Sequence, residues 1–135
     1  MKIVFADTGY WEAVLNPNDQ LHGKAKEMSV SLGKVRQVTS EMVLDELLAA
    51  LCKLPIRPYA IRGVQAIISN PNVEVVPQTS LQFARAFDLY RQRSDKEWSL
   101  TDCASFEIMR ERGLTEALAH DNHFVQAGFV AQLRE

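Results

Sequence analysis

The sequence predicts an α/β fold, namely a three-layer α/β/α sandwich with a central parallel sheet. Short apolar runs alternate along the chain with longer stretches of helical composition, and this alternation indicates strands connected by helices. The length of 135 residues suits a single domain over residues 1–135. An apolar content of 47% and a charged content of 24% are typical of an ordinary globular chain.

The first strand and the first helix are predicted from local signals. Ile3–Ala6 is a short apolar run typical of a buried strand, and Asp7-Thr8-Gly9 is typical of a turn that ends it. The range 19–32 is helical in composition, with Asn16-Pro17-Asn18 as its start signal and Gly33 as its stop signal. No element is predicted between the turn and this start signal.

The middle of the chain continues the alternation. A second strand is predicted over 35–38, and Thr39-Ser40 can cap the helix that follows it. That helix has a strongly periodic pattern in which apolar residues surround one acid: Met42, Val43, Glu46, Leu47, Ala50 and Leu51. Pro55 and Pro58 end it and begin another helix, which runs to about Ser69.

A third strand and two further helices are predicted in the second half. The strand covers 73–76, and a helix over 80–93 follows it. We expect its apolar residues to face inward or nearly so: Leu81, Ala84, Phe87, Leu89 and Tyr90. Ser99-Leu100-Thr101-Asp102 has the form of a capping box and predicts the start of a helix that ends at Gly113.

The last part of the chain supplies a fourth strand over 117–120 and a candidate fifth strand over 129–133. The carboxyl ends of parallel strands meet at one edge of the sheet. In α/β folds, binding sites form outside this edge. The polar residues that follow the strands are therefore the first candidates for function.

Four acidic residues are the candidates at this edge. Asp7 ends the first strand, Asp121 follows the fourth, and Asp102 lies in the first turn of a helix. Glu46 has apolar neighbours at helical spacing, so it belongs to the side that packs inward, and no Lys or Arg stands at helical spacing from it. Several acids without matched bases indicate a divalent cation with oxygen ligands, Mg²⁺ or Mn²⁺. Such a site can activate a water for attack at phosphorus.

Each acid also has a purely structural interpretation. Asp7 can begin a turn, Asp102 can cap a helix, and Asp121 can cap a short final helix. Glu46 can be less buried than its pattern implies, because Asp45 beside it belongs to the polar face. The residues alone leave both interpretations open.

Four segments, in this order, resemble the PIN domain family, and the length resembles its VapC-type toxin branch. The segments are Ile3-Val4-Phe5-Ala6-Asp7-Thr8-Gly9, Thr39-Ser40 with Val43–Leu48, Asp95 with Trp98–Ser105, and Ala117–Phe124. The combination of Ser-Leu-Thr-Asp-Cys with His-Asp-x-His-Phe is the most specific part of the resemblance. The segment from Pro55 to Arg93 is the variable part of that family and indicates little about substrate.

The resemblance implies an endoribonuclease that depends on Mg²⁺ or Mn²⁺ and cleaves RNA with a metal-activated water, leaving a 5′-phosphate and a 3′-hydroxyl. It implies that four residues are both the metal ligands and the catalytic acids: Asp7, Glu46, Asp102 and Asp121. Asp95, Thr8 and Ser99 match positions with supporting roles. The resemblance also implies a toxin of a toxin–antitoxin pair, an antitoxin that presents an Arg or Lys to the acids, and a homodimer.

Other functions stay open at this point. A PIN-like domain without toxin function could process RNA or only bind it, although a binding domain has no need to hold repelling carboxylates together. A receiver-like signalling domain would need adjacent acids after the first strand, where this chain has Asp7-Thr8. A zinc site at His120 and His123 would require both residues to lie on a helix, and only Asp121 lies beside them.

Hydropathy and cysteine content limit the location. The longest apolar run, Leu47–Cys52, is far shorter than the ~20 residues of a membrane span, and an acid as early as Asp7 is unlike a signal peptide. Cys52 and Cys103 are expected to be buried free thiols, which suits a reducing compartment. We therefore expect a cytoplasmic protein that does not enter membranes.

The charge pattern gives no general signal for nucleic acid. A net charge of −2 argues against a broad polyanion-binding surface, although divalent cations at the acids would offset this charge. Trp11 and Trp98 could stack on bases but are expected to be buried. The cationic residues available for phosphate contacts are Lys24, Lys26, Lys34, Arg36, Lys53, Arg57, Arg62, Arg91 and Arg93.

Overall fold

The computed structural model describes residues 2–134, and at its centre is a five-stranded sheet in the order β3-β2-β1-β4-β5. All four neighbouring strand pairs are parallel. The strands are β1 (Ile3–Ala6), β2 (Arg36–Ser40), β3 (Val73–Val76), β4 (Glu116–Leu118) and β5 (Val130–Ala131). The predicted parallel sheet is confirmed, and each strand overlaps its predicted range.

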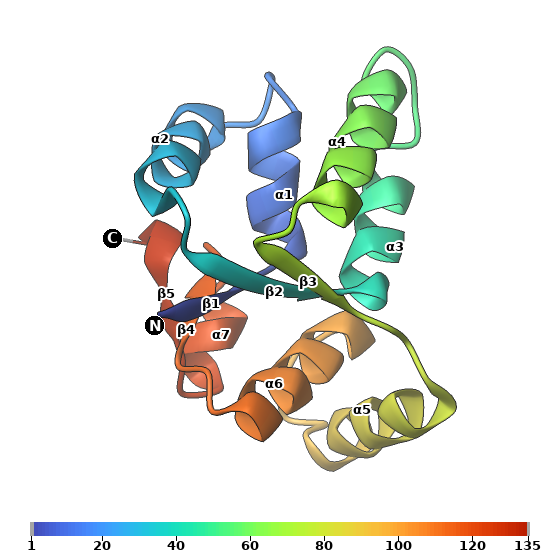
Figure 1. Ribbon diagram of the computed structural model, residues 1–135. Coiled ribbons are helices and arrows are strands. Elements are labelled where there is room, and N and C mark those ends of the chain that lie inside the picture. Colours follow the sequence, from blue (N-terminus) through green and yellow to red (C-terminus); the bar gives the residue numbers. More distant parts are fainter. Residues whose placement is uncertain (1, 135) are drawn as a thin grey trace.

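Helices cover both faces of the sheet and give the predicted three layers (Figure 1). One face carries α1 (Thr8–Leu15), α2 (His22–Leu32), α3 (Glu41–Ala50) and α4 (Arg57–Ser69). The other carries α5 (Ser80–Gln92), α6 (Leu100–Arg112) and α7 (Asn122–Gln126), and a short 3₁₀ turn, Gln132–Arg134, follows β5. Among the helices of residues 2–134, none combines the length and the apolar content that crossing a bilayer requires.

Local sequence signals explain several helix boundaries. The Ser40 side chain accepts a hydrogen bond of 3.1 Å from the Val43 backbone and so caps α3. The predicted capping box of α6 is present in full. Gly113 ends α6 with a φ of 66°, a left-handed conformation that favours glycine. These signals are local, so they could be recognised in the sequence.

The core lies on both sides of β1. On one side, the buried Phe106 ring packs edge-on against Trp98 and Phe124, with centroid distances of 4.9 and 5.0 Å. On the other side, Trp11 Nε1 donates to Thr39 Oγ1 at 3.2 Å, and Thr39 Oγ1 donates to the carbonyl of Ala6 at 2.9 Å. This relay joins α1, β2 and β1. The burial of both tryptophans confirms their predicted packing role.

One helix was not predicted. The turn expected at Asp7-Thr8-Gly9 is wrong, because Asp7 is the N-cap of α1 and Thr8 and Gly9 lie in its first turn. An Asp-Thr-Gly sequence suits a helix start as well as a turn, and α1 buries Tyr10 and Trp11 against the rest of the molecule. Helix α2 begins at His22 rather than at residue 19, because Asp19 forms a turn and its Oδ1 accepts from the Leu21 backbone at 2.8 Å.

The expectation that the apolar residues of 80–93 face inward is wrong for most of them. Leu81, Phe87 and Tyr90 are 61%, 50% and 48% exposed, and Ala84 is exposed as well. Helix α5 packs beside α6 at the margin of the molecule rather than flat against the sheet (Figure 1). Within this helix Ala86 is the buried residue. The apolar stripe of α5 therefore faces outward.

The two cysteines have different environments. Cys103 is a buried free thiol in α6, as predicted. Cys52 is free but exposed, because it lies in the loop between α3 and α4 rather than on a packed helix face. The prediction that both thiols are buried is therefore wrong for Cys52.

Candidate functional site

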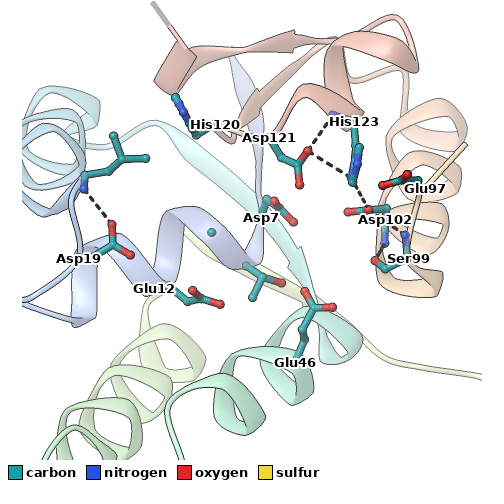
Figure 2. A pocket seen from close by; sticks show the side chains of 13 residues that line it. Asp7, Glu12, Asp19, Glu46, Glu97, Ser99, Asp102, His120, Asp121 and His123 are labelled. Atoms are coloured by element: carbon teal, nitrogen blue, oxygen red, sulfur yellow. Dashed lines mark hydrogen bonds and ion pairs between the residues drawn. The ribbon is translucent and has the colours of Figure 1, made fainter.

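A pocket of about 560 Å³ lies at the carboxyl edge of the sheet (Figure 2). It opens where β1 and β4 end, and the strand order turns at this place: the chain moves outward from β1 through β2 to β3, and later returns on the other side as β4 and β5. This switch point is where α/β sheets place their ligands. Among residues 2–134, no Lys or Arg lines the pocket, and seven acidic residues do: Asp7, Glu12, Asp19, Glu46, Glu97, Asp102 and Asp121.

Asp7 is placed by the junction between β1 and α1. Its backbone N–H donates to Leu118 of β4 at 3.2 Å, which extends the sheet pairing by one residue. Although Asp7 is the N-cap of α1, its carboxylate makes no capping bond and points into the pocket (Figure 2). The side chain is 6% exposed. The next residue, Thr8, has its Oγ1 buried without a hydrogen-bond partner within the described chain.

Burial raises the pKa of Asp7 from 3.8 to about 8, and it is the largest cause. The neighbouring carboxylate of Asp102 raises this pKa further, and those of Glu46 and Asp121 add to the effect. A hydrogen bond from the Thr8 backbone acts in the opposite direction. The pKa of Glu12 is also raised, first by burial and then by Asp19 and Glu46. The pocket therefore disfavours negative charge unless a cation balances it.

Asp102 is held by the capping box at the start of α6. Its backbone N–H donates to Ser99 Oγ at 3.0 Å, and its Oδ2 accepts from the Ser99 backbone at 3.0 Å. The same Oδ2 lies 2.9 Å from His123 Nδ1. Both of these contacts end on one oxygen, so Oδ1 is the atom left for a ligand. The capping role expected for Asp102 is thus real and leaves half of its carboxylate free.

Asp121 is bound in a comparable way at the start of α7. Its Oδ1 accepts from the His123 backbone at 2.9 Å, and His123 Nδ1 lies 3.2 Å from the same oxygen. The capping interpretation is correct here as well, and Oδ2 is left for a ligand. The imidazole of His123 stands between Asp102 and Asp121 and orients both (Figure 2).

Glu46 reaches the pocket from α3, on the opposite wall. The Ser40 cap sets the start of this helix, and Glu46 follows on the half-buried side with its carboxylate directed at the pocket (Figure 2). The Glu46 carboxylate raises the pKa of both Asp7 and Glu12. The four acids named from the sequence are thus brought to one pocket by β1, α3, α6 and the β4–α7 junction.

The supporting residues divide into two groups. Thr8 and Ser99 line the pocket. Asp95 does not line it; its carboxylate forms a two-pronged ion pair with Arg93 at 3.0 and 3.1 Å, and this pair lowers the pKa of Asp95. Asp95 therefore contacts Arg93 rather than the acidic pocket.

Sequence reasoning missed three acidic residues of the pocket, namely Glu12, Asp19 and Glu97, and the orienting position of His123. His123 was considered as a zinc ligand with His120, but its Nδ1 faces two carboxylates, whereas His120 Nδ1 faces the Leu133 carbonyl at 3.2 Å. Glu12 was missed because α1 was missed. Asp19 and Glu97 lie in loops, where no periodicity marks the direction of a side chain.

The donor set fits a hard divalent cation. Asp102, Asp121 and His123 each offer one ligand atom, and these atoms lie within 4.8 Å of one another. Carboxylates with several places left for water are the usual environment of Mg²⁺, and Mn²⁺ also accepts an imidazole nitrogen. The Thr8 hydroxyl is buried without a hydrogen-bond partner, and the pKa of Asp7 is raised. A hydrated cation would supply a water to the hydroxyl and a positive charge to balance the Asp7 carboxylate. Asp7, Glu46, Asp102 and Asp121 could hold such an ion.

The chain belongs to the PIN domain family, whose model matches residues 4–130. It is 33% identical to the 23S rRNA-specific endonuclease VapC20 of Mycobacterium tuberculosis over 128 residues, which is 95% of this chain and 96% of that protein. The crystal structure of VapC20, described as a sarcin–ricin loop cleaving toxin, has a TM-score of 0.86 and 31% identity, with 94% of this chain and 96% of that chain covered. The resemblance to the VapC-type branch is confirmed.

A second solved structure shares the fold alone. FitAcB from Neisseria gonorrhoeae has a TM-score of 0.64 and 16% identity, with 95% of this chain and 94% of that chain covered. Family membership also removes the receiver-like alternative, because the PIN model spans nearly the whole described chain. The parallel sheet, the acidic pocket at its carboxyl edge and the relatives all support membership of the PIN domain family.

Proposed function

We propose that this protein is an endoribonuclease, the toxin of a toxin–antitoxin pair, and that Asp7, Glu46, Asp102 and Asp121 hold a catalytic Mg²⁺ or Mn²⁺. The observation that carries the proposal is the convergence of these acids in one pocket without a Lys or Arg. The similarity to an rRNA endonuclease over almost the full length of both chains supports it.

The residues of the acidic pocket have different roles in the proposed reaction. A bound divalent cation supplies charge for the phosphate in the transition state and a more acidic water as nucleophile. Asp102 and Asp121 each keep one carboxylate oxygen for the ion, while His123 fixes their rotamers through the other. Asp7 would hold the cation as a carboxylate and release its proton to solvent, because the positive charge would lower its raised pKa. Thr8 Oγ1 has a free hydrogen bond for a hydrating water or a phosphate oxygen.

The substrate we propose is the sarcin–ricin loop of 23S rRNA. VapC20 is described as cleaving that loop, and it shares the fold of this chain at a TM-score of 0.86. Action on ribosomal RNA implies the cytoplasm as the place of function. The products expected for attack by water at phosphorus in this family are a 5′-phosphate and a 3′-hydroxyl.

The partners we propose are a cognate antitoxin and a second copy of the chain. An antitoxin that inserts an Arg or Lys among the seven acids would neutralise the pocket and block it. Large apolar side chains exposed on the described surface, among them Leu54, Ile68 and Leu81, supply material for such interfaces. Light scattering of the isolated chain tests the homodimer, since a monomeric mass at micromolar concentration would contradict it.

The proposal is tested by incubating the purified protein with a 23S rRNA fragment that contains the sarcin–ricin loop. We expect one cut within the loop, in Mg²⁺ or Mn²⁺ only, with a 5′-phosphate on the downstream product. Cleavage that persists in EDTA, or that requires Zn²⁺, would overturn the acidic site. Cleavage of other RNAs with the loop left intact would overturn the substrate and keep the enzyme class.

A further inference from the structure

A second pocket, of about 590 Å³, lies next to the acidic pocket, between the carboxyl end of α5 and the start of α6. We propose that it binds an unpaired nucleotide of the RNA beside the scissile phosphate, with the base stacked on an aromatic ring and the backbone held by cations. We call it the aromatic–basic pocket; its working residues are Phe87, Tyr90, Arg91, Arg93, Lys96 and Trp98. The proposal deepens the nuclease function proposed above and rests on it.

The two pockets are continuous. Glu97 and Ser99 line both of them. Ser99 is also the residue whose backbone binds Asp102 Oδ2 at 3.0 Å, and Glu97 stands beside Asp102 in Figure 2. A strand of RNA with its phosphate at Asp102 therefore meets the aromatic–basic pocket at a neighbouring nucleotide, because the two pockets share part of their walls.

The charges of the two pockets complement each other. Among residues 2–134, no Lys or Arg lines the acidic pocket, whereas Arg91, Arg93 and Lys96 line the aromatic–basic pocket together with Glu97. Arg91 is paired with Asp88 and Arg93 with Asp95, and Arg93 keeps further N–H groups for a phosphate. Single-stranded nucleic acids are held in proteins by cations along the backbone and by aromatic platforms for the bases. The aromatic–basic pocket combines both features at the place where substrate must pass.

Arg93 is preorganised for this role. Its Nε and one Nη donate to Asp95, and its guanidinium carbon lies 4.9 Å from the centroid of the Trp98 ring. These contacts hold the guanidinium over the indole ring and leave the remaining Nη hydrogens for a phosphate. Asp95, which the sequence singled out and the acidic pocket does not include, thus has a position to support the site from outside.

Tyr90 and Phe87 supply the stacking surface. They are 48% and 50% exposed, although they lie on an amphipathic helix whose apolar residues the sequence predicted to be buried. A ring that is half exposed has one face available for a base. The volume of about 590 Å³ is within the usual range of small-ligand sites and accommodates one nucleotide.

The decisive variants are Tyr90→Ala and Lys96→Gln, each with a matched control. Tyr59→Ala is the control for the tyrosine. Tyr59 is 44% exposed, and the guanidinium carbon of Arg62 lies 5.2 Å from the centroid of its ring. Unlike Tyr90, it lies on α4, which covers the other face of the sheet. Lys34→Gln is the control for the lysine, because the exposed Lys34 precedes β2 and so lies at the edge of the sheet opposite the site. Neither Tyr90 nor Lys96 lines the acidic pocket.

Two measurements are made with a sarcin–ricin loop RNA hairpin. The first is the binding of the fluorescein-labelled hairpin to the full chain in an Asp7→Asn background, by fluorescence anisotropy over a salt series. We expect Tyr90→Ala to weaken binding about tenfold at every salt concentration, as loss of one stacked base predicts. Lys96→Gln should weaken binding and reduce the slope of log K against log salt by about 0.7. Both controls should bind within twofold of the background.

The second measurement is the Mg²⁺-dependent cleavage of the same hairpin by the four variants with Asp7 intact. KM should rise for Tyr90→Ala and Lys96→Gln, while kcat stays within about threefold. Unchanged KM and unchanged binding would overturn the subsite. A fall in molecular mass by light scattering for Tyr90→Ala, in parallel with the loss of binding, would assign Tyr90 to an interface between copies and also overturn it.

The two proposals fail in different ways. If the wild-type protein cleaves no RNA, the hairpin included, but the variants still bind the hairpin less tightly than their controls, the nuclease function fails while the pocket holds as an RNA-binding site. If the wild-type protein cleaves and the variants match their controls, the function holds and the subsite fails.

Discussion

Asp102 Oδ2 and His123 Nδ1 lie 2.9 Å apart, although the two residues belong to different helices and are separated by β4. The contact ties the start of α6 to the start of α7 on one side of the acidic pocket. It also occupies one oxygen of Asp102 and leaves the other facing the pocket. One oxygen of the Asp102 carboxylate therefore binds His123, and the other is available to a ligand.

Asp7→Asn should stabilise the metal-free protein. The folded-state pKa of Asp7, about 8, lies above its ordinary value of 3.8, so folding favours the protonated form. The stability that Asp7 contributes is fully present below pH 4 and is lost as the pH rises to about 8. We therefore expect the variant to melt about 5 °C higher than the wild type at pH 8 in EDTA, with the difference vanishing near pH 4. Thermal melts across this pH range provide the measurement, and a lower melting temperature for the variant at pH 8 would contradict it.

Mg²⁺ should stabilise the wild type and release protons. At ten times its Kd the ion adds about 1.4 kcal/mol to the free energy of unfolding, and this gain should be smaller in Asp7→Asn. Because Asp7 is protonated at neutral pH without metal, binding should release close to one proton near pH 7. Calorimetry in two buffers of different ionisation enthalpy measures this number. Binding without proton release would show that the ion does not reach Asp7.

Asp102→Asn should abolish cleavage and keep the fold. The Asn side chain can still accept the Ser99 backbone hydrogen bond, so the capping box survives while the ligand charge is lost. We expect at least a hundredfold loss of kcat with a melting temperature within a few degrees of wild type. Glu111→Gln, an exposed change on the same helix, is the matched control and should cleave normally. A variant that cleaves like the wild type would leave Asp102 with a capping role only.

His123→Ala should weaken the metal site without removing a carboxylate. Groups that orient metal ligands typically contribute 10- to 100-fold in metal affinity or activity, and His123 contacts both Asp102 and Asp121. We expect the Mg²⁺ concentration for half-maximal cleavage to rise at least tenfold. His120→Ala is the comparison, since that imidazole contacts the Leu133 carbonyl instead. Equal effects of the two changes would count against an orienting role for His123.

Thr39→Val should destabilise the protein more than Thr39→Ser. The buried hydroxyl of Thr39 accepts a hydrogen bond from Trp11 Nε1 and donates one to the Ala6 carbonyl. Valine cannot make either hydrogen bond. Such a loss costs about 1–3 kcal/mol, whereas serine keeps the hydroxyl. Urea denaturation of the two variants measures the difference. Similar midpoints would show that water replaces the lost hydrogen bonds.

The residues explain why some features were predictable. The capping box at Ser99 and the left-handed Gly113 are local signals, so α6 was predicted almost to the residue. The convergence of Asp7 and Asp121 followed from a general property of parallel sheets, whose carboxyl ends share one edge. Glu46 was recognised because an acid among apolar neighbours at helical spacing is costly unless it has a task.

Other features depend on contacts between distant segments. Helix α1 forms around Tyr10 and Trp11, which are average helix formers, and its stability comes from packing and from the bond between Trp11 and Thr39. The periodicity of α5 shows an apolar stripe but does not say whether the sheet or the solvent faces it. The role of His123 depends on Asp102, which no local pattern joins to it.

The order of the acids along the chain has a consequence for the timing of synthesis. The first comes from residue 7 and the last from residue 121, and each is delivered by a different element of the sandwich. A nascent chain that has emerged only to α6 still lacks the β4–α7 junction, and with it both Asp121 and the imidazole that orients Asp102. In the proposed metal site, the full set of four acids is therefore present only after nearly the whole sandwich has been translated.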